Sequence, residues 1–138
     1  MRDVAYVALG SNLGDRAGYL ALGRRAMARL PDSRLIAESE IEETPPVGPV
    51  GQPSFLNQMV ALETALAPHA LLDALLDIER SAGRIRGERW GPRTLDLDIV
   101  TMETQRVADA RLTVPHPELA NRPFWQRQLD RLRSRRNA

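Results

Sequence analysis

Two aspartates and a group of arginines form the part of this sequence best suited to chemistry. Asp96 and Asp98 are separated by one residue in a stretch that alternates apolar and acidic side chains. In a strand, this spacing places both carboxylates on one face, about 6.5–7 Å apart. Paired carboxylates suit hard, oxygen-preferring cations such as Mg²⁺, and guanidinium groups suit polyphosphates. The combination predicts phosphoryl-type transfer from a nucleotide, and the arginines that precede the pair are Arg84, Arg86, Arg89 and Arg93.

The same residues also have an ordinary interpretation. Asp96 and Asp98 would then be surface carboxylates, neutralised by nearby arginines in exposed ion pairs worth about 0–1 kcal/mol each. Residues 89–93 read Arg-Trp-Gly-Pro-Arg, however, and a surface ion pair needs neither a Gly-Pro turn nor a tryptophan. This composition favours a functional loop. Glu79, which lies in an expected helix, would on its own be an exposed acid.

His116 is a second candidate for chemistry. It lies between Pro115 and Pro117, which restrict the backbone on both sides of it. Arg122 follows closely, so we expect His116 to contact phosphate or to handle a proton. The other histidine, His69, stands near an expected helix start and is expected to be a surface residue.

Three of the few aromatic residues adjoin these segments, namely Phe55, Trp90 and Phe124. Each of them alone is consistent with core packing. A pair of them is also able to hold a flat heterocycle between two rings, with each stack contributing roughly 0.5–1.5 kcal/mol beyond area burial. The amide of Asn57 would then hydrogen-bond the edge of that heterocycle.

Composition excludes several kinds of chemistry. The chain has 138 residues, 43% hydrophobic and 27% charged, which fits one globular domain spanning 1–138. It contains no cysteine, which excludes disulfides and thiolate chemistry. It also contains no lysine, which excludes a Walker A loop and a Schiff base. No apolar run resembles a membrane span or a signal peptide, so a cytoplasmic protein is expected.

The elements expected to position these residues follow the order β-α-β-β-α-β, which is typical of a ferredoxin-like α+β sandwich. The apolar spacing predicts strands over 4–9, 34–43, 55–64 and 95–100. It predicts helices from Asp15 to about Leu30 and from Pro68 to near Gly83. Residues 44–54 and 83–94 are rich in proline or glycine and predict long functional loops. Trp125, Leu129 and Leu132 suggest a short C-terminal helix.

Several of these stretches together resemble a known family, the 6-hydroxymethyl-7,8-dihydropterin pyrophosphokinases of folate biosynthesis. The resemblance covers roughly residues 4–124 and rests most strongly on the arginine-tryptophan segment that leads into the two aspartates. The matching stretches are 8–15 (ALGSNLGD), 44–46 (TPP), 52–57 (QPSFLN), 89–98 (RWGPRTLDLD) and 114–117 (VPHP).

The resemblance implies transfer of pyrophosphate from ATP to the hydroxymethyl group of the pterin, with release of AMP. It implies that Asp96 and Asp98 hold two Mg²⁺ ions that bridge the ATP phosphates. Four further residues would act on the phosphates: Arg84, Arg93, His116 and Arg122. The pterin site would comprise Thr44, Pro45, Val47, Phe55, Asn57 and Phe124. The ATP site would comprise Glu79, Arg84, Trp90, Arg93, Ile99, Leu112, Thr113 and His116.

Two other functions stay open from the sequence. The chain stops at Ala138, and residues 124–138 are expected to form an atypical Arg-rich helical tail where relatives usually continue. A shortened relative that binds pterin or ATP with weak or no turnover is therefore the first alternative. A nucleic-acid binder that uses the tail arginines is the second, although a net charge of +1 gives no broad basic surface. We expect a monomer that acts on small molecules, without nucleic acid or membrane partners.

Overall fold

A computed structural model describes residues 2–45, 53–83 and 94–136. At position 136 it describes only the main chain. Four of the expected site residues lie outside these ranges: Val47, Arg84, Trp90 and Arg93. No helix in the described part of the chain is long and apolar enough to cross a membrane.

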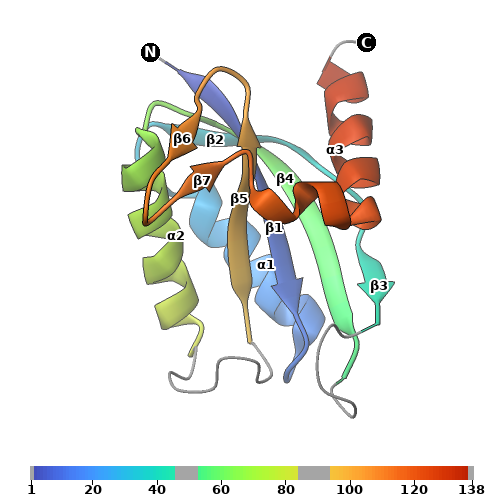
Figure 1. The fold of residues 1–138 in the computed structure, drawn as a ribbon. Coiled ribbons are helices and arrows are strands. Elements are labelled where there is room, and N and C mark those ends of the chain that lie inside the picture. The colour runs from blue at the N-terminus through green and yellow to red at the C-terminus, as the bar shows by residue number, and fades with distance from the viewer. Residues whose placement is uncertain (1, 46–52, 84–93, 137–138) are drawn as a thin grey trace.

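The centre of the fold is an antiparallel sheet with strand order β2-β4-β1-β5, in which β3 also pairs with β4 (Figure 1). The strands are β1 (Asp3–Ser11), β2 (Ser33–Glu38), β3 (Glu42–Thr44), β4 (Phe55–Thr64) and β5 (Asp96–Met102). The helices are α1 (Arg16–Ala28), α2 (Pro68–Ser81) and α3 (Pro123–Arg136). A two-stranded hairpin, β6 (Val107–Ala108) and β7 (Thr113–Val114), and the 3-10 helix η1 (Pro117–Asn121) connect β5 to α3. The order of the main elements confirms the expected ferredoxin-like α+β fold.

The first core lies between the sheet and helices α1 and α2. Asp15 caps α1 as predicted, because its side chain accepts a hydrogen bond from the Gly18 N–H at 3.0 Å. Leu20 of α1 and Leu75 of α2 pack with Leu97, which faces them from β5. This packing fixes the orientation of β5, since residues that alternate with Leu97 must point to the opposite face.

The second core covers part of that opposite face and is built by α3. Trp125, Leu129 and Leu132 are all buried there, together with Tyr6 and Met59 of the sheet. In Figure 1, η1 and α3 lie in front of the strands and α1 lies behind them. Because both faces are covered along much of its length, β1 is buried at every residue and shows no polar alternation.

The prediction of one continuous strand over 34–43 was wrong in one respect, because the structure divides this stretch between β2 and β3. Ser39 ends β2, since its hydroxyl accepts from the Met59 N–H at 2.9 Å and donates to the Glu40 carbonyl at 2.9 Å. Such local side-chain bonds compete with a regular ladder. Beyond this point Ile41 is 43% exposed, while Glu42 is half-buried beneath α3.

Candidate active site

One face of the sheet is apolar along one part of its length and carries polar or small residues along the other. Under α3 the face is apolar and includes Tyr6, Met59 and Val100. Beyond the part covered by α3, the same face carries polar or small residues, as the strand alternation shows for Asn57 and Asp96. The helix therefore divides one sheet face into a core region and a region suited to binding.

A row of three residues crosses that second region. Gly10 of β1 pairs with Asn57 of β4 on one side and with Asp96 of β5 on the other. With neighbouring strands about 4.8 Å apart, Asn57 and Asp96 stand about 10 Å apart across the sheet. A Cβ at position 10 would lie 3.4 Å from the Asn57 Oδ1 atom and 3.7 Å from the Phe55 Cδ1 atom. Gly10 is buried, and a side chain at this position would contact both Asn57 and Phe55.

Asp96 and Asp98 occupy the face opposite Leu97, as the alternation predicted. Both are half-buried, and the Asp98 side chain is 40% exposed. Among the described residues, no group of three or more His, Cys, Asp or Glu side chains lies close enough to hold a metal. Mg²⁺ bound with substrate phosphates typically takes one or two carboxylates and keeps several waters. The two half-buried carboxylates fit an ion of this kind.

Glu79 holds the strand between the two aspartates. Its side chain is only 4% exposed, and its Oε2 accepts a hydrogen bond from the Leu97 N–H at 2.7 Å. The expectation of an exposed acid was therefore wrong, because α2 places this position against the outer edge of β5. The contact fixes the main chain directly between Asp96 and Asp98.

His116 approaches the aspartates from the other end of the site. Its backbone N–H donates to the Val100 carbonyl at 2.7 Å, and its Nε2 lies 3.9 Å from the Asp98 Oδ1. Its Nδ1 accepts from the Glu118 N–H at 3.0 Å, so the neutral ring carries its proton on Nε2. Burial lowers the pKa of His116 below the ordinary value of 6.5, and the positive charge of Arg122 lowers it further. The carboxylates of Asp98 and Glu118 raise the pKa, but they do not offset these two effects. At neutral pH the ring therefore presents an N–H donor near Asp98.

Trp125 supports two of the expected phosphate ligands, a role that the sequence did not reveal. Its indole meets the His116 ring edge-on, with centroids 5.0 Å apart and planes at 87°. The Arg122 guanidinium carbon lies 4.4 Å from the centroid of the same indole. Trp125 is 2% exposed, so the side chains of His116 and Arg122 both pack against a buried core residue.

A cleft of about 290 Å³ opens at the outer edge of β5. It brings together five of the expected ATP-site or metal residues: Asp98, Ile99, Leu112, Thr113 and His116. Its remaining wall includes Asp109 and Arg111 from the hairpin, which the sequence did not single out. This volume is near the lower end for small-molecule sites.

Two of the expected pterin residues, Thr44 and Asn57, meet on the β4 side of the aspartates. The Asn57 Nδ2 donates to the Thr44 Oγ1 at 2.6 Å, so these two residues are in direct contact. Phe55 shares the sheet face of Asn57, and Pro45 follows Thr44 as an exposed residue. Phe124 is half-buried in the second core, where its ring centroid lies 6.4 Å from that of Trp125.

Comparison with known proteins identifies the family of the chain. Residues 6–134 match the family described as 7,8-dihydro-6-hydroxymethylpterin-pyrophosphokinase. Three relatives are named 2-amino-4-hydroxy-6-hydroxymethyldihydropteridine pyrophosphokinase. The Pseudomonas aeruginosa protein is 49% identical over 119 residues, which cover 86% of this chain and 74% of the relative. The Methylorubrum extorquens protein is 45% identical over 120 residues (87% and 76%), and the Bacillus subtilis protein is 44% identical over 127 residues (90% and 74%). The chain therefore belongs to the 7,8-dihydro-6-hydroxymethylpterin-pyrophosphokinase family.

Proposed function

We propose that the chain transfers the pyrophosphoryl group of ATP to 6-hydroxymethyl-7,8-dihydropterin and releases AMP, as a step of tetrahydrofolate biosynthesis. One observation supports the proposal: the two aspartates connect the cleft with the cross-strand row. Asp98 lines the cleft at the edge of β5, whereas Asp96 lies in the cross-strand row that contains Asn57. A phosphate chain that extends from the cleft would reach a substrate held near Asn57 by passing over both carboxylates.

The two substrates divide the site between them. The nucleotide would occupy the cleft along Ile99, Leu112, Thr113 and His116, with Glu79 behind the strand. Ile99 is 3% exposed and packs in the first core, so it offers mainly its backbone to a ligand. The pterin would lie over Gly10, with its edge toward Asn57 and Thr44. The remaining expected contacts are Pro45, Val47, Phe55 and Phe124 for the pterin, and Arg84, Trp90 and Arg93 for ATP.

Asp96 and Asp98 would hold Mg²⁺, and we propose two ions, bound together with the ATP phosphates. Bound there, Mg²⁺ would neutralise phosphate charge and so favour attack on phosphorus. Arg122 would add positive charge from its position on Trp125. His116, neutral and protonated on Nε2, would donate a hydrogen bond to a phosphate oxygen.

The reaction itself demands positioning more than acid-base chemistry. The pterin hydroxymethyl oxygen attacks the β-phosphorus, the bond from that phosphorus to the α–β bridging oxygen breaks, AMP leaves with the bridging oxygen, and the hydroxyl proton passes to solvent. Charge that develops on the phosphate oxygens is stabilised by groups already fixed in place. We further propose that the protein works on these small molecules as a cytoplasmic monomer, without nucleic acid or membrane partners.

A coupled assay for AMP tests the proposal. We expect Mg²⁺-dependent AMP formation only when both ATP and the pterin are present. Asp96→Asn and Asp98→Asn should each lower kcat by about 100-fold or more, because each removes a charge positioned at the reacting phosphates. Asp130→Asn, an exposed acid on α3, is the matched control and should keep full activity. Formation of ADP in place of AMP, or binding of both substrates without turnover, would refute the proposed reaction.

A further inference from the structure

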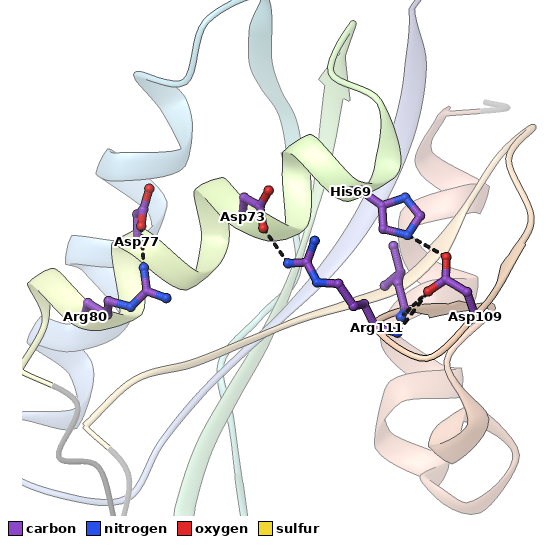
Figure 2. Close-up of polar contacts among 7 residues, drawn as sticks. His69, Asp73, Asp77, Arg80, Asp109 and Arg111 are labelled. Carbon is purple, nitrogen blue, oxygen red and sulfur yellow. Dashed lines mark hydrogen bonds and ion pairs between the residues drawn. The ribbon is translucent and has the colours of Figure 1, made fainter.

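Two side chains on one stripe of α2 reach across to the hairpin that forms part of the cleft wall (Figure 2). His69 and Asp73 are four residues apart, which places them on the same helix face. The His69 Nε2 lies 2.7 Å from the Asp109 Oδ2, and the Arg111 Nη2 lies 2.5 Å from the Asp73 Oδ1. We call these two pairs the α2 latch. It connects the helix to the segment 109–111 at two points one helical turn apart.

Asp109 belongs to the latch and also orders the turn at the tip of the hairpin. Its Oδ1 accepts from the Arg111 N–H at 2.9 Å and from the Leu112 N–H at 3.0 Å. Its backbone N–H donates to the Leu112 carbonyl at 3.0 Å. One carboxylate oxygen therefore orders the turn while the other meets His69. These backbone hydrogen bonds also lower the pKa of Asp109, so the group stays charged at neutral pH.

The turn held in this way is part of the nucleotide cleft. Asp109, Ala110 and Arg111 line the cleft, whereas His69 and Asp73 do not. Any effect of the two α2 residues on a bound nucleotide must therefore pass through the position of 109–111. This separation makes them positioning residues and distinguishes them from groups that contact the ligand.

Among the described residues, few contacts besides the latch and the hydrogen bonds within the turn fix the tip of the hairpin. Its ladder consists of two residue pairs, Val107 with Val114 and Ala108 with Thr113. Leu112 and Val114 anchor its base in the first core, but 109–111 are all exposed. Exposed ion pairs contribute little to the stability of a whole fold. They are sufficient, however, to change the population of local openings in a segment held by so few other contacts.

We propose that the α2 latch positions the 109–111 turn for nucleotide binding and so sets the affinity for ATP without taking part in the chemical step. The inference rests on the proposed function, since it takes the cleft to be the ATP site. It predicts that the latch changes KM for ATP while kcat and pterin affinity stay constant.

The variants for the test lie on α2, away from the cleft. The double variant His69→Ala/Asp73→Ala removes both pairs. His69→Gln keeps a donor toward Asp109, and Asp73→Asn keeps an acceptor for Arg111, so each should retain more affinity than the corresponding alanine. Asp77→Asn is the matched control, because Asp77 continues the same stripe but pairs within the helix with Arg80 at 2.6 Å (Figure 2).

Calorimetry with a non-hydrolysable ATP analogue and Mg²⁺, alongside steady-state AMP assays, gives the readout. We expect the double variant to raise Kd for the analogue and KM for ATP by about three- to thirtyfold. The expected kcat and pterin Kd lie within about twofold of the wild type, and thermal denaturation verifies that the variant is folded.

Unchanged analogue affinity in a folded double variant would overturn the inference while leaving the proposed function intact. An equal loss in Asp77→Asn, or a parallel loss of pterin affinity and kcat, would also overturn it, because either result indicates a general effect on the fold. If the wild-type protein bound no ATP analogue, the proposed function itself would fail, and the inference with it.

Discussion

The imidazole of His116 stands edge-on against the indole of Trp125, with ring centroids 5.0 Å apart. The two residues come from different segments, since His116 precedes η1 and Trp125 begins the buried stripe of α3. Arg122 lies against the same indole. A residue of the second core thus determines where two candidate phosphate ligands are held.

Replacement of Trp125 should damage activity more than its effect on stability would explain. Trp125→Phe keeps an apolar ring but removes part of the surface beneath Arg122, a cation–π contact worth roughly 0.5–2 kcal/mol. We expect kcat/KM to fall by about three- to tenfold. Leu132→Val, a small deletion deeper in the same core, should cost about 0.5–1.5 kcal/mol of stability and leave kcat/KM near the wild-type value. Equal effects of the two variants on kcat/KM would contradict a specific role for Trp125.

The ionisation of His116 should depend on its two charged neighbours in opposite directions. We expect NMR titration of the ligand-free protein to give a pKa below 6.5, mainly because the ring is partly buried. Arg122→Gln should raise this pKa, and Asp98→Asn should lower it further. A folded-state pKa below the unfolded one means that the unfolded state binds the proton more readily. The His116 contribution to the free energy of unfolding therefore falls as pH drops below 6.5. A pKa above 6.5 in the wild type would contradict the described environment.

Loss of the Glu79 carboxylate should destabilise the strand that carries both aspartates. Glu79→Ala removes the acceptor of the Leu97 N–H, at an expected cost of about 1–3 kcal/mol in urea unfolding. Glu79→Gln retains an acceptor oxygen and should lose less. Asp77→Ala, an exposed position two residues earlier on the same helix, should change stability by less than about 0.5 kcal/mol. Wild-type stability in Glu79→Ala would show that the contact contributes nothing.

A side chain at position 10 should obstruct the pterin without unfolding the sheet. The Cβ of Gly10→Ala would meet its nearest neighbour at 3.4 Å, an ordinary contact, so we expect a folded protein. Gly10→Val adds two methyl groups between Asn57 and Asp96 and should weaken pterin binding by about tenfold or more, measured by calorimetry. Binding of an ATP analogue is the internal control and should be retained. Unaltered pterin affinity in the valine variant would place the pterin elsewhere.

Local rules were sufficient to predict the main elements. The expected strand over 55–64 coincides with β4, and the expected helix from Pro68 corresponds to α2, because proline suits the first helical turn. The face of Asp96 and Asp98 followed from the two-residue period of β5. The stripe of Trp125, Leu129 and Leu132 predicted α3, although its length and its role as the cover of a second core were not foreseen.

The features missed from sequence depend on contacts between distant segments. The alternation over 34–43 continues through Ser39, so only the hydroxyl contact with Met59 shows where β2 ends. Two-residue strands such as β6 and β7 are too short to show a period. The burial of Glu79 depends on where α2 meets the edge of β5, and the His69–Asp109 pair joins residues 40 positions apart. None of these relationships has a local sequence pattern.

The division of one sheet face by α3 has a consequence for inhibition. Tyr6 and Ala8 beneath the helix, and Gly10 beyond it, are alternate residues of a single strand. Displacement of the first turn of α3 would, through Trp125, withdraw His116 and Arg122 at the same time. A compound that wedges beneath this turn would therefore inhibit the enzyme without entering the nucleotide cleft, and because it withdraws groups that bind phosphate, a high concentration of ATP would oppose its binding.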